Sequence, residues 1–292
     1  MKGLKNNTLT GLLQWFTGSI SHKYEEKESK AITNVVFEHF FGLNQIDLIV
    51  KKDLRFNESQ IVNLYRIIKK LNQDIPLQHI TGKSHFRSLE LLVNNHVLIP
   101  RPETEELVGR IVESIQGLPE NSEYTIWDIG TGSGAIAISL AKELPQTKVW
   151  GSDISENALE VATRNGERAG VNINFFKHDI LGGEIPLKEM NIIVSNPPYV
   201  RESEKEKMKA NVLEYEPHLA LFVSDNDPLL FYRAIAKVAI EALKPGGFLF
   251  AEINEALGKQ TVELLNSLGF QKTELRKDIF EKDRFVKAQK PL

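Results

Sequence analysis

The sequence predicts an α/β protein with a doubly wound, mostly parallel sheet, a small N-terminal helical domain and a β-hairpin linker. Strand-like and helix-like segments alternate from about Glu103 to the C-terminus, which is typical of a parallel sheet covered by helices on both faces. Residues 28–78, in contrast, show only helical periodicity. We therefore expect a helical domain over residues 1–83, the hairpin linker over 84–102 and the α/β domain over 103–292.

The composition is that of a globular protein with a sizeable core. Of 292 residues, 41% are hydrophobic and 26% are charged, which excludes a disordered chain, a fibrous repeat and a membrane protein. The net charge of −3 argues against tight binding to bare nucleic acid through phosphate contacts. The chain has no cysteine, so disulfides, thiolate nucleophiles and cysteine-ligated metals are excluded. We expect no signal peptide at the N-terminus and no transmembrane helix.

The N-terminal domain is expected to contain two helices and no catalytic residues. One face of the first helix carries Ile32, Val35, Val36, His39 and Phe40. The second helix begins at Asn57, because Asn57 and Gln60 have the spacing of a capping box. Its apolar stripe follows at residues 61, 64, 68 and 71. No strand-like alternation appears before Phe86, so this domain is more typical of a partner-binding module than of a catalytic one.

A β-hairpin and a helix start are predicted next. Two apolar runs, 89–93 and 97–99, flank the Asn94-Asn95-His96 stretch, and Asn tolerates the backbone of a tight turn. Pro102 lies just inside the start of the following helix, where proline is favoured and acidic neighbours are stabilising.

The α/β domain has five predicted strands, four further predicted helices and two late strands. The strands cover residues 125–130, 148–154, 173–179, 191–195 and 247–253. The helices cover residues 135–144, 156–169, 229–243 and 260–268. A turn is expected at residues 244–247, and segments 273–277 and 284–288 are expected to add antiparallel edge strands.

A glycine-rich loop follows the first of these strands. It reads Gly130-Thr131-Gly132-Ser133-Gly134, and glycines allow a sharp turn and the close approach of a ligand to the backbone. Asp153 ends the next strand, 23 residues after Gly130, where a carboxylate can accept hydrogen bonds from both hydroxyls of a ribose. The pair predicts an adenosine-containing cofactor. On these residues alone, a nicotinamide or flavin cofactor remains open.

Three further candidates lie beside this loop. Asp128 either fixes the loop by accepting backbone amides or lies near a cationic group of the cofactor. Asp179 can accept a hydrogen bond from an adenine amino group, with Ile180 against the ring. The alternative for Asp179 is a solvated aspartate at a strand end.

The motif Asn196-Pro197-Pro198-Tyr199 follows the fourth strand. The two prolines lack an N–H and have a fixed φ, so this segment is stiff and presents carbonyl oxygens. The Asn196 side chain adds another acceptor, and Tyr199 offers a flat face for stacking. At the carboxyl end of a strand, where open α/β sheets bind ligands, the motif predicts an acceptor-rich site for a planar NH2 group. The alternative is a proline-rich turn with Tyr199 in the core.

These motifs together resemble a known class of enzymes. The Asn-Pro-Pro-Tyr motif, the glycine loop and Asp153 are similar to those of class I S-adenosylmethionine-dependent methyltransferases that modify amide or exocyclic amino nitrogens. With residues 76–82, 97–105 and 216–222, the chain resembles more closely the PrmC/HemK family of release factor glutamine methyltransferases, from about residue 25 to the end. His79 and His218 stand where Tyr and Arg are more often expected, outside the proposed contacts.

The resemblance implies a cytoplasmic, monomeric enzyme with a Rossmann-like fold that acts in translation termination. It would transfer a methyl group from S-adenosylmethionine, leaving S-adenosylhomocysteine, to the side-chain nitrogen N5 of the glutamine in the Gly-Gly-Gln (GGQ) motif of peptide chain release factors. The helical domain would grip the rest of the release factor. No metal, membrane or direct nucleic-acid contact is implied.

The resemblance also assigns roles to the candidate residues. Cofactor binding would involve Asp128, Gly130, Thr131, Gly132, Ser133, Gly134, Asp153, Asp179, Ile180 and Asn196. Asn196 and the Pro197 carbonyl would accept the two N–H bonds of the substrate amide, and Pro198 and Tyr199 would complete its slot. Asn196, Pro197 and Tyr199 are the expected catalytic residues.

Other functions stay open on the sequence. The same slot would serve a glutamine methyltransferase of a ribosomal protein or an adenine-N6 methyltransferase of RNA or DNA. A cofactor-binding module without activity and a nicotinamide-dependent oxidoreductase are the alternatives from other classes. The Asn-Pro-Pro-Tyr motif has no role in hydride transfer, which argues against the oxidoreductase.

Overall fold

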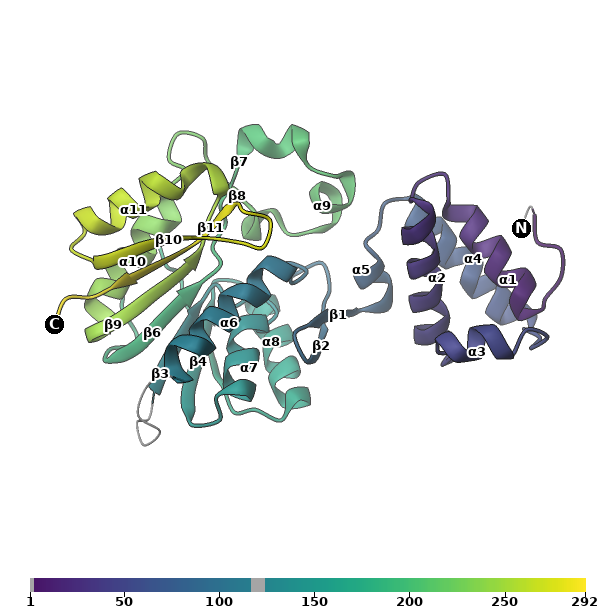
Figure 1. Cartoon of the computed structure of the whole chain (residues 1–292), viewed down its shortest axis with the longest axis horizontal. Coiled ribbons are helices and arrows are strands. Elements are labelled where there is room, and N and C mark those ends of the chain that lie inside the picture. Colours follow the sequence, from purple (N-terminus) through teal and green to yellow (C-terminus); the bar gives the residue numbers. More distant parts are fainter. Residues whose placement is uncertain (1–2, 117–123) are drawn as a thin grey trace. The chain divides into compact units, whose positions relative to one another are not determined.

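The computed structural model describes residues 3–116 and 124–292. The chain forms two compact units: Met1–Gly82 with Ala210–Tyr215, and Lys83–Lys209 with Glu216–Leu292. The first unit is helical, and the second contains the sheet (Figure 1). Among the described residues, no helix has the length and apolar character needed to span a bilayer.

Six helices build the helical unit. They are α1 (Leu9–Ile20), α2 (Glu26–Phe41), α3 (Gln45–Val50), α4 (Glu58–Asn72), α5 (Leu77–Thr81) and α9 (Ala210–Tyr215). The predicted start of α4 is confirmed, since Asn57 and Gln60 form the capping box. Helix α1 was not predicted, because Gln14 and Gly18 interrupt its apolar run. Both lie on its exposed side, while Leu12 and Phe16 are buried.

The predicted face of α2 is partly wrong. Val35 is 42% exposed, whereas Phe37 is fully buried. The buried face includes Ser29 and Thr33, and their hydroxyls are satisfied by carbonyl groups, as in the 2.7 Å hydrogen bond from Thr33 to the Ser29 carbonyl. A prediction from apolar residues alone passes over these two buried polar residues. The predicted buried face is therefore rotated relative to the observed one.

The hairpin lies earlier than predicted. Strands β1 (Lys83–Phe86) and β2 (Leu89–Leu92) pair antiparallel, so the turn is Arg87-Ser88. Arg87 adopts a φ of 50°, and its guanidinium donates to both carboxylate oxygens of Glu143, at 2.5 and 2.6 Å. A turn without Gly or Asn carries no sequence signal, which explains the error. No strand follows the predicted turn at residues 94–96 before α6 (Pro102–Gln116) begins. The prediction that no strand precedes Phe86 is also wrong, because β1 begins at Lys83.

The second unit contains a seven-stranded sheet in the order β10-β11-β9-β6-β3-β4-β5. Its strands are β3 (Tyr124–Ile129), β4 (Thr147–Asp153), β5 (Asn174–Lys177), β6 (Met190–Ser195), β9 (Leu243–Glu252), β10 (Gln271–Lys277) and β11 (Asp283–Gln289). The five strands from β9 to β5 are parallel, and β11 and β10 add an antiparallel edge. A small parallel pair, β7 (Val200–Arg201) and β8 (Phe222–Val223), lies outside this sheet. The predicted mostly parallel sheet and its late antiparallel pair are confirmed.

Helices cover both faces of the sheet (Figure 1). Helices α6 (Pro102–Gln116), α7 (Ala135–Glu143) and α8 (Glu156–Ala169) lie on one face, and α10 (Leu230–Ala242) and α11 (Gly258–Ser267) on the other. Short 3-10 turns occupy Glu202–Lys207, His218–Ala220 and Glu255–Leu257. Alternate residues of β6 enter opposite cores: Ile192 and Val194 face one, and Ile193 faces the other. This burial on both faces explains the unbroken apolar run of the strand.

The expected turn at residues 244–247 belongs to β9 instead. The register of β6 and β9 shifts between the pairs Met190–Leu243 and Ile192–Phe248, and Gly246 has a φ of 78°. The Pro-Gly-Gly stretch therefore forms an irregularity within the strand, as glycines in strands often do.

The strand order creates a switch point between β3 and β6. The chain runs outward through β3, β4 and β5, and then returns to add β6 on the other side of β3. The connections after β3 and β6 therefore diverge, which leaves a crevice at the carboxyl ends of these strands.

Candidate active site

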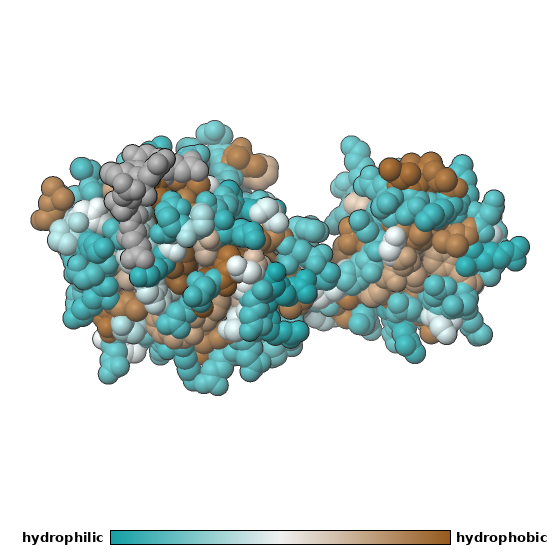
Figure 2. Space-filling model, turned by 90° about the horizontal axis from the view of Figure 1, so that it is seen from below, coloured by the Kyte–Doolittle hydropathy of each residue, from teal (hydrophilic) through white to brown (hydrophobic). Residues whose placement is uncertain are grey.

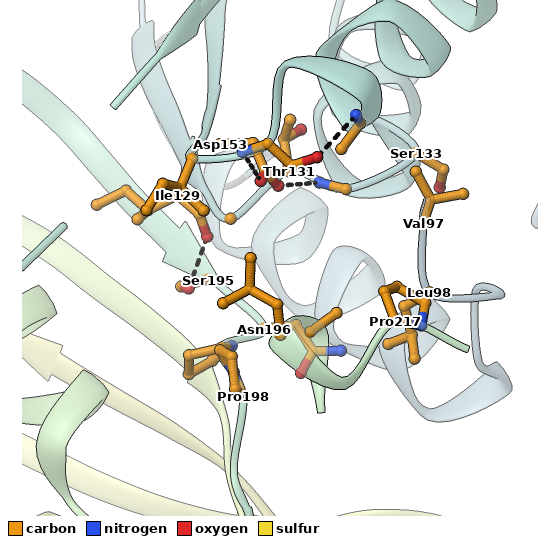
Figure 3. A pocket seen from close by; sticks show the side chains of 18 of the residues that line it. Val97, Leu98, Ile129, Thr131, Ser133, Asp153, Ser195, Asn196, Pro198 and Pro217 are labelled. Atoms are coloured by element: carbon orange, nitrogen blue, oxygen red, sulfur yellow. Dashed lines mark hydrogen bonds between the residues drawn. The ribbon is translucent and has the colours of Figure 1, made fainter. Parts of the chain in front are cut away.

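A cavity of about 330 Å³ lies at this switch point. It is lined by ten of the predicted residues: Gly130, Thr131, Gly132, Ser133, Asp153, Asp179, Ile180, Asn196, Pro197 and Pro198. Figure 3 shows Thr131 and Asp153 on one side, Asn196 and Pro198 on another, and Leu98 and Pro217 beside them. The structure thus brings together the loops after four strands. The other predicted residues, Asp128, Gly134 and Tyr199, do not line this cavity.

The glycine loop faces the cavity with its backbone. Gly130 and Gly132 have φ values of 73° and 55°, and a Cβ added to either would meet no atom within 4 Å. The left-handed backbone therefore requires glycine, and the space beside it is open. Gly134 also has a left-handed backbone, with a φ of 82°, and it allows close packing as well, because its Cβ would lie 2.7 Å from Ile138 Cδ1 and 3.2 Å from Ala162 Cβ.

Asp153 links the end of β4 to this loop. One carboxylate oxygen accepts the Gly132 N–H at 2.9 Å, and the other accepts the Ser155 N–H at 2.9 Å. Burial raises the pKa of Asp153, although these backbone N–H groups act in the opposite direction. Each carboxylate oxygen keeps lone pairs for a further donor. The residue is thus held rigidly while it still accepts hydrogen bonds at the cavity wall.

Asp128 lies behind the loop. It is fully buried, and its Oδ2 accepts from the Thr131 hydroxyl at 2.7 Å and from the Ala137 N–H at 3.3 Å. Its Oδ1 has no hydrogen-bond partner among the residues that the structure describes. Burial raises the pKa of Asp128 to about 7. Of its two predicted roles, fixing the loop is the one that these contacts support.

Asp179 and Ile180 follow β5 and line the cavity. Asp179 is exposed, and one of its carboxylate oxygens accepts the Leu181 N–H at 2.9 Å. The sequence reasoning missed a neighbour, His178, which also lines the cavity. Its ring centroid lies 5.4 Å from that of the buried Trp127, so the His178 ring adds an aromatic group to this part of the wall.

The Asn-Pro-Pro-Tyr segment forms the other side of the cavity. The Ser195 hydroxyl donates to the Ile129 carbonyl at 2.7 Å, which ties the end of β6 to β3. Asn196 is half-buried and donates from Nδ2 to the Thr104 hydroxyl oxygen at 3.1 Å. The Tyr199 side chain turns away and donates to Glu252 at 2.8 Å, and its ring packs on the core. The alternative interpretation, with Tyr199 in the core, therefore describes its position better than a stacking face does.

Buried polar residues around this segment were missed. The Glu216 side chain is 1% exposed and accepts from the Ile99 N–H at 3.1 Å and from Arg101 at 2.6 Å. It thereby joins segments 99–101 and 216–220, both of which contribute to the cavity wall. Thr104 and Glu252 form a similar buried pair at 2.7 Å. The one feature of the sequence that could have indicated Glu252 is its position at the end of a buried strand, where a carboxylate is unusual.

Two family models match this chain. The model described as the PrmC N-terminal domain matches residues 11–82, and the one described as the methyltransferase small domain matches residues 114–216. The first range falls in the helical unit, and most of the second falls in the unit that contains the cavity.

Curated relatives match almost the whole chain. A protein named release factor glutamine methyltransferase from Flavobacterium psychrophilum is 45% identical, with 94% of this chain and 96% of that protein covered. The protein of the same name from Bacteroides thetaiotaomicron is 42% identical, with 93% and 96% covered. The one from Bacillus subtilis is 33% identical, with 96% and 97% covered.

A solved structure shares the fold. The crystal structure of a methyltransferase from Pyrococcus furiosus has a TM-score of 0.51 and is 20% identical, with 81% of this chain and all of that chain covered. At this identity the match speaks for the architecture alone. With the matches over nearly its full length, the chain belongs to the release factor glutamine methyltransferase family.

Proposed function

We propose that this protein transfers a methyl group from S-adenosylmethionine to the side-chain nitrogen N5 of the glutamine in the GGQ motif of peptide chain release factors. One observation carries the proposal. The acceptor-rich segment Asn196–Pro198 and the glycine loop line the same cavity. A methyl donor on the loop and a carboxamide on the acceptors would then meet inside one enclosed space.

The residues on the cofactor side fit S-adenosylmethionine. Both oxygens of Asp153 keep acceptor capacity for ribose hydroxyls. The open space beside Gly130 and Gly132 admits the methionine end, and Asp179 and Ile180 would flank the adenine. When bound, the cofactor supplies an electrophilic sulfonium methyl. Its methyl–sulfur bond would break as the N–C bond forms, and the electron pair would remain on the sulfur of S-adenosylhomocysteine.

The residues on the substrate side would orient a poor nucleophile. The lone pair of an amide nitrogen is delocalised into its carbonyl, so alignment with the methyl group is the main requirement. The Asn196 Oδ1 and the Pro197 carbonyl would accept the two N–H bonds of the amide and stabilise positive charge that develops on nitrogen. The extra proton leaves to water after transfer. No general base is required, and Asn196 and Pro197 would act by position and polarity.

The helical unit supplies a candidate surface for the rest of the release factor. Ile46, Ile49 and Val50 of α3 are 71%, 68% and 72% exposed. Apolar patches are visible on the face of this unit that Figure 2 shows. Clusters of large exposed apolar side chains mark contact surfaces more often than chance would place them. We therefore assign substrate docking to this unit. We also propose that the enzyme acts as a cytoplasmic monomer.

Labelled S-adenosylmethionine tests the proposal directly. The protein is incubated with purified release factor, and the label is mapped by mass spectrometry. We expect one methyl group on the GGQ glutamine and a loss on the order of 10²-fold in kcat/KM for Asn196→Ala. Asn266→Ala, an exposed position on α11, serves as the matched control with unchanged activity.

Parallel reactions with ribosomes and with nucleic acid separate the alternatives. Label on a ribosomal-protein glutamine or on adenine, with none on the release factor, would replace the proposed substrate. Full activity of Asn196→Ala on the release factor would remove Asn196 from the reaction.

A further inference from the structure

A chain of hydrogen bonds runs from Asn196 and Thr104, which both line the cavity, to the buried carboxylate of Glu252. The Asn196 Nδ2 donates to Thr104 Oγ1 at 3.1 Å, and Thr104 Oγ1 donates to Glu252 Oε2 at 2.7 Å. The Tyr199 hydroxyl donates to the other oxygen, Glu252 Oε1, at 2.8 Å. Thr104 is 5% exposed and Glu252 is 1% exposed. Three segments, the first turn of α6, the end of β6 and the end of β9, thus meet at one carboxylate.

The direction of each hydrogen bond follows from the chemistry of Glu252. Both of its oxygens accept a hydroxyl proton, as a carboxylate does. The Thr104 hydroxyl has a single proton, and it is given to Glu252. Towards Asn196 the hydroxyl can therefore only accept, so Asn196 must present its NH2 group to Thr104. The amide is planar, and Oδ1 is then the atom left to serve as an acceptor.

Strand pairing holds these groups in register. Ser195 of β6 lies opposite Ala251 of β9, so the next residues along the two parallel strands are Asn196 and Glu252. Thr104 reaches the same point from α6, and its backbone N–H donates to the Arg101 carbonyl at 3.1 Å. Thr104 and Glu252 thus lie on regular elements, which position side chains more rigidly than loops do, and Asn196 directly follows one.

We propose that Thr104 and Glu252 are positioning residues for methyl transfer: they hold the Asn196 amide with its oxygen, and not its nitrogen, available to the substrate. This inference rests on the proposed function, in which the Asn196 oxygen accepts an N–H of the substrate carboxamide. Thr104 itself lines the cavity, whereas Glu252 does not. Each acts through Asn196.

Burial of a carboxylate has a cost that fits such a role. A charged group removed from water destabilises the fold unless it is paired and hydrogen-bonded. Burial raises the pKa of Glu252, and the charge of Arg284, together with the two hydroxyl donors, opposes that shift. Arg284 is itself held by Asp278 at 3.2 Å. When it is ionised, a carboxyl group in this place accepts hydrogen bonds and cannot donate one.

Kinetics with matched variants test the inference. Thr104→Val removes the hydroxyl and keeps the shape, and Thr104→Ser restores the hydroxyl. Thr261→Val is the control, because Thr261 is 1% exposed and its hydroxyl donates to a backbone carbonyl of Leu257 at 2.9 Å. We expect kcat on release factor to fall about 10- to 100-fold in Thr104→Val, with the Kd of S-adenosylhomocysteine little changed. Thr104→Ser and Thr261→Val should retain kcat.

Glu252→Gln provides a second variant with nearly the same volume. A carboxamide can donate as well as accept, so the hydrogen bonds can run in the opposite direction and the Asn196 amide can turn over. We expect a loss of kcat similar to that of Thr104→Val. Should Thr104→Val and Thr261→Val lose the same activity, or should Thr104→Val and Glu252→Gln keep full kcat, the inference is overturned.

A measurement without substrate separates this inference from the proposed function. In protein labelled with 15N-asparagine, the Asn196 side-chain NH2 signals are assigned by their disappearance in Asn196→Asp. We expect these protons to exchange with water at least about 10-fold faster in Thr104→Val than in wild type or Thr261→Val. Equal exchange would overturn the positioning role even if release factor is the substrate. If the wild-type enzyme is inactive on release factor, the proposed function is refuted. The exchange rates of the Asn196 side-chain protons would still decide whether Thr104 positions Asn196.

Discussion

The buried carboxyl of Asp128 makes the stability of the sheet unit depend on pH. Burial raises its pKa from an ordinary value of 3.8 to about 7. Between these two values the folded chain holds this proton more tightly than the unfolded chain does. Raising the pH through this window therefore lowers the free energy of unfolding, and the loss is complete above about pH 7.

The size of the effect follows from the shift. Each unit of pKa difference is worth about 1.4 kcal/mol. With a folded-state pKa of about 7 and an unfolded-state pKa of 3.8, the free energy of unfolding contributed by this group falls by about 2.5 kcal/mol between pH 5 and pH 8. Asp128→Asn keeps an oxygen that can accept from Thr131 and Ala137, but it cannot titrate. The free energy of unfolding of this variant should lack this decline. The difference in stability between the variant and wild type should therefore shift in favour of the variant as the pH rises.

Urea unfolding measured by tryptophan fluorescence provides the assay. The chain has three tryptophans, and Trp127 and Trp150 lie in β3 and β4 of the sheet unit. In a Trp15→Phe background, the signal reports on that unit alone. The free energy of unfolding is compared at pH 5, 6, 7 and 8 with and without Asp128→Asn. Parallel pH dependences in the two proteins would refute the reasoning.

Three further predictions concern Asp153 in the cavity wall, Glu216 beside it, and two glycines with a left-handed backbone. Asp153→Ala should weaken binding of S-adenosylhomocysteine about 10- to 100-fold, because two ribose hydroxyls lose a charged acceptor; an unchanged Kd in calorimetry would contradict the assigned role. Glu216→Gln should destabilise the sheet unit by about 1.5–3 kcal/mol, since the carboxylate is 1% exposed and accepts two hydrogen bonds; urea unfolding measures this. Gly170→Ala, with a φ of 68° and no atom within 4 Å of the new Cβ, should cost about 1 kcal/mol. Gly134→Ala should cost more, because its Cβ also meets Ile138 Cδ1 at 2.7 Å; equal losses would show that the helix packing relaxes.

The parts of the site that lie at strand ends could be predicted from the sequence. Asp153 and Asn196 each follow a buried apolar run, and the carboxyl ends of neighbouring parallel strands meet at one edge. Two residues 43 positions apart were therefore expected close together, and both line the cavity. The glycine loop was recognised because its backbone conformation needs glycine at Gly130 and Gly132.

The two residues proposed to position Asn196 could not be predicted from the sequence. Thr104 and Glu252 are 148 positions apart, and each taken alone resembles an ordinary residue of its element: a helix first turn and a strand end. Only the packing of α6 against β9 brings them together. The sequence also did not predict which way the Tyr199 side chain points. Two prolines precede it and interrupt the strand, so the alternation of side chains along a strand cannot be extended to this position.

The polarity proposed for Asn196 would also decide which chemically similar side chains the cavity accepts. With its NH2 group engaged by Thr104, the amide offers oxygen to the cavity, and the prolines that follow have no N–H to offer. A glutamate carries an oxygen where glutamine carries its NH2 group. Its carboxylate oxygens would therefore face the Asn196 and Pro197 oxygens with no hydrogen to share between them. If Asn196 binds the substrate amide as proposed, deamidated protein would be refused without any steric selection.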